Sequence, residues 1–429
     1  MSGLPHASLL ENARFNATVV VPNALQGIFR RRRQAVRVAS AAGIDGQAVG
    51  LLEGMNHSYE GGPVWVKLVR DDALLLLDPA DVGRALEESP DPFASDPKAK
   101  RDGMVHFQPE ALTISRGEEW ASRRRFAEAV LGAAPLEHVK AVTREEIERL
   151  LAGPVAKADG KLEWEPWNRA IQRITRRVVL GDAAAGDWAL TETLEDMMSG
   201  ANGMPGKPAD AVEAFQRRIA AYANRAESGS LVAAFGDAPT DERTKPMAQV
   251  THWMFALGDT LAANSLRCLA VLATHGEQRV KALDDSSGSY MDACLHEAMR
   301  LWPTTAMLSR VSLVPTEWKG ETVPEGTQLV IVNTYGHRDR DRLEFADRFA
   351  PEEWTERNAA ANPAFNHFSR GPQGCPGQAL SLLVGRVAIR CVLERGVESA
   401  SPRLDPSKPL PHMVDFFGTS VRVFAPDAE

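Results

Sequence analysis

A short loop near the C-terminal end of the sequence constrains the fold more than any other feature. Residues 371–377 contain three glycines and two prolines around Cys375, a composition that suits neither a helix nor a strand. Helical periodicity then predicts an apolar helix over residues 378–394. The dipole and the free N–H groups at the start of such a helix favour a thiolate. Cys375 is therefore a candidate metal ligand, although a structural cysteine or a reactive thiol remains open from this chemistry alone.

The composition is that of a large globular protein. Hydrophobic residues make up 44% of the 429 residues and charged residues 25%. The net charge of −8 argues against a nucleic-acid binder, whose surface would be basic. Neither a signal peptide nor a run of about 18 uncharged apolar residues is visible, so we expect no membrane span. Four cysteines without paired spacing favour a reducing cytoplasm over a disulfide framework.

Most of the sequence has the periodicity of helices. The predicted helices are residues 136–151, 208–226, 247–275, 289–301 and 378–394, and the predicted strands are residues 64–69, 73–77 and 327–332. Because strands and helices do not alternate, we expect a single mainly α domain over residues 1–429, with small, mainly antiparallel β-sheets. The basic run at residues 30–33 is expected on a solvated helix face.

Two pairs of polar residues fall inside predicted helices. Glu297 and Arg300 stand three residues apart, so they share one helix face and can pair, in the interior or at the surface. Asp259 and Thr260 place an acid beside an alcohol in an apolar helix, which is costly unless both have partners or a role. Helix capping or a hydrogen-bonded core pair is the alternative to a chemical role for Asp259 and Thr260.

The spacing Phe368-x-x-Gly371-x-x-x-Cys375-x-Gly377 resembles the haem-binding signature of the cytochromes P450. The resemblance implies a P450-like helical domain that binds haem b, with Cys375 as the proximal ligand of the iron. It also implies that Phe368 packs against the cysteine loop. One position departs from the family pattern, because Gln373 stands where Arg or His usually contacts a haem propionate.

The resemblance assigns roles to three further residues around the haem. Trp120 and Arg124 stand one helical turn apart and resemble the family's W-x-x-x-R helix. In that helix both residues can face a haem propionate, and the arginine can donate two hydrogen bonds to it. On its own, this basic segment would also suit an amphipathic surface helix. Arg310 resembles a second propionate contact.

The Glu297 and Arg300 pair resembles the family's E-x-x-R motif, which a downstream arginine normally closes. Glu353 stands at the place of that arginine, and we expect Arg348 or Arg357 to substitute for it.

The segment from Ala256 to Thr260 resembles the oxygen-binding kink of the family's central helix, with Leu257 where glycine is usual. By this resemblance a local helix opening is expected, with Asp259 and Thr260 as a proton relay for O–O bond cleavage. The implied activity is a monooxygenase that inserts one oxygen atom from O2 into a small apolar organic molecule. A peroxygenase on the same fold, a non-catalytic haem sensor or carrier, and a protein without a cofactor are the alternatives.

Electrons are expected from a separate ferredoxin or flavodoxin with its reductase, docked through Arg123, Arg125 and Arg370. By resemblance, residues 93–114, 197–204, 304–308 and 416–417 line the substrate pocket. The individual pocket residues expected from these segments and the central helix are Ala256, Thr304, Thr305, Met307, Phe416 and Phe417.

Overall fold

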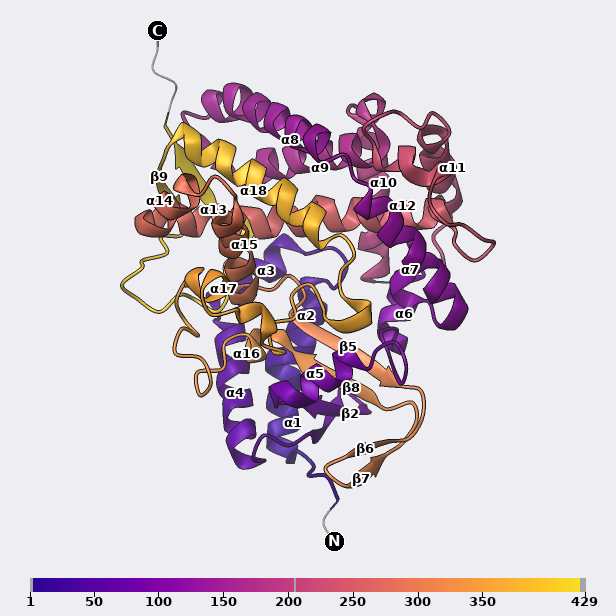
Figure 1. The fold of residues 1–429 in the computed structure, drawn as a ribbon. Coiled ribbons are helices and arrows are strands. Elements are labelled where there is room, and N and C mark those ends of the chain that lie inside the picture. Colours follow the sequence, from indigo (N-terminus) through magenta and orange to yellow (C-terminus); the bar gives the residue numbers. More distant parts are fainter. Residues whose placement is uncertain (1–2, 204–205, 425–429) are drawn as a thin grey trace.

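The chain divides its elements between a layer of long helices and a smaller region built on a sheet (Figure 1). The computed structural model describes residues 3–203 and 206–424. The mainly α fold with small sheets that the sequence predicts is confirmed.

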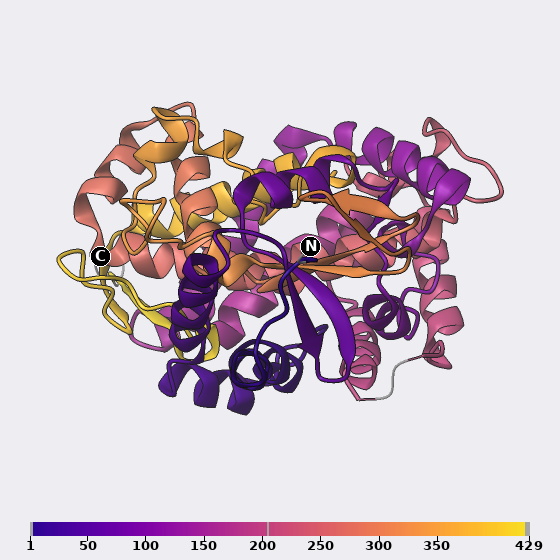
Figure 2. The ribbon, with the colours of Figure 1, turned by 90° about the horizontal axis from the view of Figure 1, so that it is seen from below.

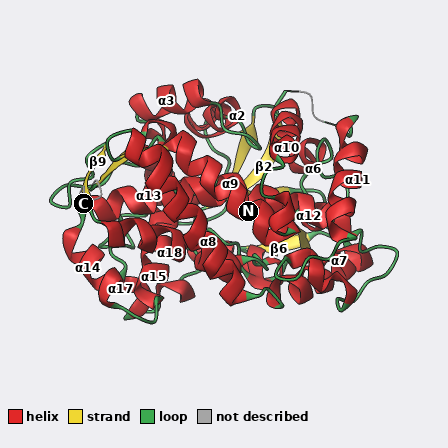
Figure 3. Ribbon diagram, turned by 90° about the horizontal axis from the view of Figure 1, so that it is seen from above, coloured by secondary structure: helices red, strands yellow, loops and turns green. Residues whose placement is uncertain are grey.

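The helices are α1 (Leu9–Phe15), α2 (Val21–Gln26), α3 (Arg33–Ala41), α4 (Ile44–Ser58), α5 (Pro79–Glu87), α6 (Lys98–Met104), α7 (Gly117–Gly132), α8 (Leu136–Leu150), α9 (Trp164–Leu180), α10 (Trp188–Ala201), α11 (Ala211–Ala223), α12 (Pro246–Phe255), α13 (Leu261–Thr274), α14 (Gly276–Asp284), α15 (Ser289–Leu301), α16 (Asn333–Gly336), α17 (Glu352–Thr355) and α18 (Gln378–Arg395). Viewed from above, α14, α15 and α17 lie at one end of the molecule and α7 and α11 at the other (Figure 3). Predicted and observed helix ends agree within three residues, and the predicted bounds of α15 match those observed.

The larger sheet has the strand order β1-β2-β8-β5-β3. Its strands are β1 (Val64–Leu68), β2 (Asp71–Leu76), β3 (Phe93–Ala94), β5 (Met307–Ser312) and β8 (Gln328–Val332). All neighbours are antiparallel except β2 and β8, which are parallel. Smaller sheets pair β4 (Lys161–Glu163), β10 (Ser420–Val423) and β9 (Val397–Ser401), and β6 (Thr316–Trp318) with β7 (Glu321–Val323).

Helices cover both faces of the larger sheet, which explains why β2 is apolar at consecutive positions rather than at alternate ones. Successive side chains of a strand point to opposite faces. Ala73 and Leu75 pack with residues of α4, whereas Leu74 and Leu76 pack with residues of α5. The sheet is therefore buried on both of its faces at β2.

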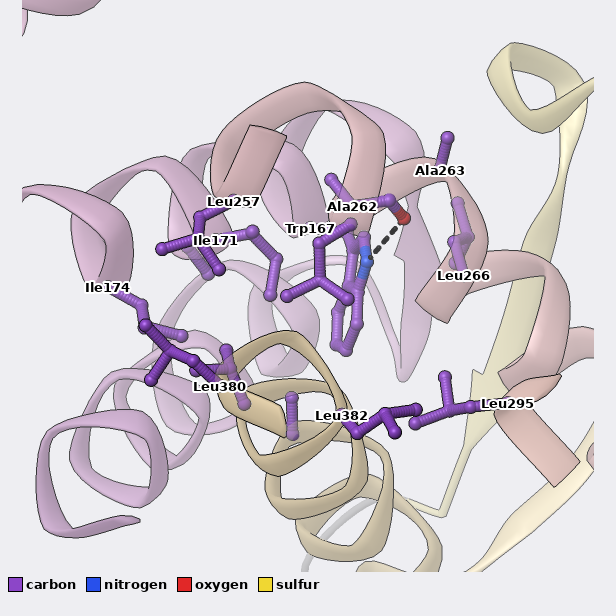
Figure 4. Close-up of a cluster of buried hydrophobic side chains, with 14 of the residues drawn as sticks. Trp167, Ile171, Ile174, Leu257, Ala262, Ala263, Leu266, Leu295, Leu380 and Leu382 are labelled. Atoms are coloured by element: carbon purple, nitrogen blue, oxygen red, sulfur yellow. Dashed lines mark hydrogen bonds between the residues drawn. The ribbon is translucent and has the colours of Figure 1, made fainter. Parts of the chain in front are cut away.

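The main core lies where α9, α13, α15 and α18 meet (Figure 4). At its centre, the indole N–H of Trp167 donates to the carbonyl of Ala262 at 3.0 Å and is shared with Ser265 Oγ at 3.2 Å. Leu380 and Leu382, close behind the cysteine loop, pack into this same cluster. The core thus fixes the start of α18 relative to the central helix.

The central helical stretch, Pro246–Thr274, is long and apolar enough to cross a membrane, with a mean hydropathy of 1.2. However, 78% of the 18-residue window that reaches this hydropathy is buried inside the protein. Such burial is typical of the core helix of a globular protein rather than of a lipid-facing span. A π-helical turn over Ala256–Thr260 interrupts it, between α12 and α13.

The basic run at residues 30–33 lies mostly outside a helix, so the expected solvated helix face is found only at Arg33, which begins α3 and is exposed. The N-terminal helices gather along one side of the molecule (Figure 2), and most of the run forms the connection between α2 and α3. Arg30 bonds inward to Glu195 and Arg31 to the carbonyl of Thr304. Acceptors far away in the sequence therefore draw these side chains into the protein.

Candidate functional site

The cysteine loop is a chain of tight turns that ends at the start of α18. A 3₁₀ turn spans Gly371–Gln373, and the backbone N–H of Cys375 donates to the carbonyl of Phe368 at 2.8 Å. Gly371 has a φ of +64°, and a Cβ there would come within 2.5 Å of the carbonyl oxygen of Leu86. A glycine is therefore required where the loop passes α5. The Cys375 side chain is exposed.

The surroundings of Cys375 act on the pKa of its thiol in opposite directions. Surrounding protein atoms raise the pKa of the Cys375 thiol, and this effect outweighs the N–H of Gly377 and the charge of Arg124, which both lower it. The polypeptide alone therefore favours the thiol. A cation bound at the sulfur would remove the proton, because a coordinating thiol is deprotonated.

Helix α7 supplies an arginine to the cysteine loop. Arg124 Nη1 donates to the carbonyl of Gly374 at 2.6 Å, and its Nε donates to Glu128 at 2.7 Å. Trp120, one turn earlier, is half-buried against the main core. The structure thus places Arg124 beside the residue preceding Cys375.

Arg310 on β5 is buried, with 3% exposure, and its hydrogen bonds to the described residues all go to neutral oxygens. Its N–H groups donate to Ser89 Oγ at 3.0 Å, Ser309 O at 3.0 Å and Ser369 Oγ at 3.1 Å. Burial lowers the pKa of Arg310 to about 10. A guanidinium held in this way keeps an uncompensated positive charge that suits an anionic group.

Gln373 and Lys100 extend this cluster. Gln373 Oε1 accepts from Ser89 Oγ at 3.0 Å, while its buried Nε2 has no partner among the residues the structure describes. Lys100 donates to the carbonyls of Ser95 and Thr113. Burial, with a smaller contribution from Arg310, lowers the pKa of Lys100 to about 7. No local pattern in the sequence distinguishes Lys100 from other lysines.

Glu297 and Arg300 form a fully buried pair on α15. Two N–H groups of Arg300 donate to the two carboxylate oxygens, each at 2.7 Å. The carboxylate also accepts from the backbone N–H of Ala350 and from the indole N–H of Trp354, each at 2.9 Å. Trp354 therefore occupies the position in this network that the sequence assigned to an arginine.

Neither arginine proposed for that position takes it. Arg357 pairs with Glu353 at 2.7 Å. Arg348 takes part only through its backbone carbonyl, which accepts from Arg300 at 2.9 Å. That expectation is therefore wrong, because a neutral indole from the short helix α17 reaches the carboxylate instead.

Asp259 lies in the π-helical turn and is held by three donors. The side-chain amides of Asn168 and Gln172, on α9, donate to its Oδ1 at 3.2 and 2.9 Å. Arg30 lies 3.5 Å from its Oδ2. A Cβ at Gly258 would come within 2.7 Å of Gln172, so this glycine makes room for the amide. The sequence did not identify these three partners, which come from distant segments.

Asp259 and Thr260 face a cavity of about 500 Å³. Of the expected pocket residues, Thr304, Thr305, Met307, Phe416 and Phe417 line it, whereas Ala256 does not. Neither the 93–114 loop nor the described part of residues 197–204 contributes, and Met204 lies outside the described residues. Cys375 is also not among the lining residues.

The cavity is more polar than the sequence suggested. Five arginines and five acidic side chains line it, together with aromatic rings. The charged residues are Arg30, Arg31, Arg33, Arg169, Arg267, Asp45, Glu165, Glu192, Glu195 and Asp259.

A family model and several known proteins each match a part of this chain. A family model described as "Cytochrome P450" matches residues 270–411. Cytochrome P450 4c3 of Drosophila melanogaster is 28% identical over 178 residues, which are 37% of this chain and 33% of that protein. The mitochondrial 1,25-dihydroxyvitamin D(3) 24-hydroxylase of Mus musculus is 33% identical over 120 residues, 28% of this chain and 23% of that protein.

A third relative is the cytochrome P450 monooxygenase nodW of Hypoxylon pulicicidum, 30% identical over 175 residues, with 36% of this chain and 32% of that protein covered. The matches thus span about a quarter to a third of each relative. The matched region contains the buried Glu297 and Arg300 pair, Arg310 and the cysteine loop. Residues 270–411 therefore resemble the cytochrome P450 family, whose members bind haem b through a cysteine thiolate.

Proposed function

We propose that this chain is a haem-thiolate monooxygenase, which inserts one oxygen atom from O2 into an organic substrate. The observation that carries the proposal is that two arginines bond to the segment containing Gln373 and Cys375. Arg124 donates to the carbonyl of Gly374, and Arg310 donates to Ser369 Oγ. When bound, haem b supplies the activation of O2 and the cleavage of its O–O bond.

The residues around the loop fit the group. Haem carries two propionates, and Arg310 and the unpartnered Nε2 of Gln373 offer donors without a carboxylate of their own. Arg124 adds a further positive charge next to Gly374. Cys375 would hold the iron, and these three side chains would hold the propionates.

Asp259 and Thr260 would carry protons to the reacting oxygen. The amides of Asn168 and Gln172 fix one carboxylate oxygen of Asp259, which leaves the other beside Arg30. A positioned carboxylate and hydroxyl on a helix opening can pass protons from water. The peroxygenase alternative needs no such relay.

Substrate, electron donor and location complete the proposal. The substrate has an apolar body, which suits the aromatic rings of the cavity. Electrons come from a separate ferredoxin or flavodoxin with its reductase. We propose a soluble, bacterial-type enzyme in the cytoplasm, supported by four free cysteines and the mostly buried central helix. Arg125 is exposed and remains a candidate docking residue, but Arg123 is buried and donates to the carbonyl of Arg243, so that assignment is wrong.

The test begins with the difference spectrum of the reduced, carbon monoxide-bound protein, in which a thiolate-type Soret band is expected. Cys375→Ser should abolish that band. Product formation with NAD(P)H and a surrogate ferredoxin system then separates a monooxygenase from a haem sensor. Turnover supported only by hydrogen peroxide would favour a peroxygenase, and a colourless protein would overturn the proposal.

A further inference from the structure

Two arginines in the cavity keep a positive charge that no acidic side chain contacts. Arg31 donates to the carbonyl of Thr304 at 2.8 Å and to Asn23 Oδ1 at 3.4 Å. Arg267, on α13, donates to the carbonyls of Val414 and Trp302. Within the described part of the chain, no carboxylate lies within 4 Å of either guanidinium.

The other arginines of this cavity differ from these two. Arg30 pairs with Glu195 at 2.8 Å and with Asp259 at 3.5 Å. Arg33 pairs with Glu165. Arg169 is exposed and stacks on Trp188. Among the arginines of the cavity that are not exposed, Arg31 and Arg267 are therefore the ones whose positive charge has no ion-pair partner in the described part of the chain.

Asp45, near the start of α4, is an acidic residue whose pKa is affected by the charges of both arginines. It makes no hydrogen bond or ion pair with either of them among the contacts of the described residues. Burial raises the pKa of Asp45, and the charges of Arg31 and Arg267 only partly oppose this effect. Asp45, Arg31 and Arg267 all line this cavity, so the two arginines are open to a further anion there.

An aromatic wall borders the same cavity. The rings of Trp164 and Phe416 lie 4.5 Å apart, and those of Phe416 and Phe417 lie 4.2 Å apart. Arg267 sits over Phe416, with its guanidinium carbon 5.1 Å from the ring centre. Aromatic faces of this kind pack well against a planar ring. Charge and aromatic surface therefore adjoin within one cavity.

We propose that the substrate is an aromatic carboxylic acid, whose carboxylate binds at Arg31 and Arg267 and whose ring lies against Trp164 and Phe416. This inference rests on the proposed function, because Asp259 and Thr260 line the same cavity. Planar guanidinium groups with free N–H donors bind carboxylates through charge-assisted hydrogen bonds. An acid held there would keep its apolar body in the part of the cavity that the relay residues line.

The test compares 2-naphthylacetate with 2-naphthylacetamide, which has nearly the same shape but no charge. Titration calorimetry on the purified haem-loaded protein should give about tenfold tighter binding of the acid than of the amide. Arg31→Gln should remove this preference. Arg33→Gln is the matched control, because its charge is already paired with Glu165, and it should keep the preference. Arg267 is unsuitable for substitution, since its bonds to Val414 and Trp302 also hold the fold together.

Asp45→Asn provides a test in the opposite direction. It removes a negative charge that competes with the ligand, so it should tighten binding of the acid and leave binding of the amide unchanged. Equal affinities of the wild-type protein for acid and amide would overturn the inference. Equal losses in Arg31→Gln and Arg33→Gln would do the same, provided that circular dichroism shows both variants folded.

The outcome separates the two proposals. Calorimetry measures the affinity for the added acid or amide and does not depend on the spectrum of the haem. A protein with a thiolate-type spectrum but no preference for the acid would leave the monooxygenase standing and refute the carboxylate site. A protein with the preference but no such spectrum would refute the monooxygenase alone.

Discussion

The indole nitrogen of Trp354 lies 2.9 Å from Glu297 Oε2 and donates a hydrogen bond to this buried carboxylate. With Arg300 and the N–H of Ala350, it brings the number of donors on the two oxygens to four. The buried pair thus has one cation for one anion and needs no second arginine. A neutral donor suffices because the charge of Glu297 is already balanced by Arg300.

We expect Trp354→Phe to destabilise the protein by about 1–3 kcal/mol, because a buried carboxylate loses one of its donors while the ring largely retains its packing. Urea denaturation followed by circular dichroism measures this loss. The matched control is Glu353→Gln on the neighbouring residue, whose partner Arg357 is exposed to solvent. This control should change stability by at most about 0.5 kcal/mol. Equal stabilities of Trp354→Phe and the wild-type protein would show that the indole bond is dispensable.

The sequence predicts local features of this network well. Glu297 and Arg300 are three residues apart in a helix, so their pairing follows from helix geometry alone. The glycines and prolines around Cys375 likewise define a loop without knowledge of the rest of the fold. Trp354 is different, because it lies 57 residues from Glu297 and comes close only through the packing of α17 on α15. No local pattern distinguishes it from other tryptophans.

The basic run at residues 30–33 shows why charge patterns alone mislead. Charged residues are usually solvated, so the run by itself predicts a surface position. Arg30 instead reaches Glu195 on α10 and Asp259 in the central helix. Those acceptors come from segments more than 160 residues away, and only the tertiary fold brings them near the N-terminal connection.

Arg310 gives a prediction for cofactor retention. We expect Arg310→Gln to release haem about tenfold faster than the wild-type protein, because a charge-assisted bond to a propionate is lost. Transfer of haem to apomyoglobin, followed at the Soret band, measures the rate. Arg125→Gln removes an exposed charge from α7 and serves as the control, for which no acceleration is expected. An unchanged rate in Arg310→Gln would exclude Arg310 as a propionate ligand.

Asp259 gives a prediction for turnover. Asp259→Asn should lower the rate of product formation by about 100-fold, because an amide cannot carry the proton that the carboxylate transfers. The thiolate-type spectrum should persist, since Asp259 does not contact the cysteine loop. Glu195→Gln is a fair comparison, because it removes the other carboxylate that pairs with Arg30 and should lower turnover far less. Similar losses in both variants would assign the effect to Arg30 rather than to a proton relay.

His337 gives a prediction for stability against pH. This buried histidine lies 3.2 Å from the carbonyl of Arg300 through Nδ1, and its Nε2 accepts from the backbone N–H of Asn366 at 3.2 Å. Burial, together with the charge of Arg300, lowers the pKa of His337 from 6.5 to about 3. Below pH 6.5 the unfolded chain gains a proton that the folded chain refuses, so stability falls as the pH falls toward 3. The contribution of His337 is at most about 1.4 kcal/mol per pH unit in this range.

His337→Gln isolates this contribution, because glutamine can donate to one partner and accept from the other without binding a proton. Urea denaturation at intervals between pH 7 and pH 5 should give a shallower fall in the free energy of unfolding for the variant than for the wild-type protein. Parallel curves would mean that His337 does not resist protonation in the folded chain. Only a neutral His337 can accept the hydrogen bond from the N–H of Asn366, so parallel curves would also argue against this bond. The bond links the segment before the cysteine loop to His337, whose carbonyl accepts from the buried Arg300.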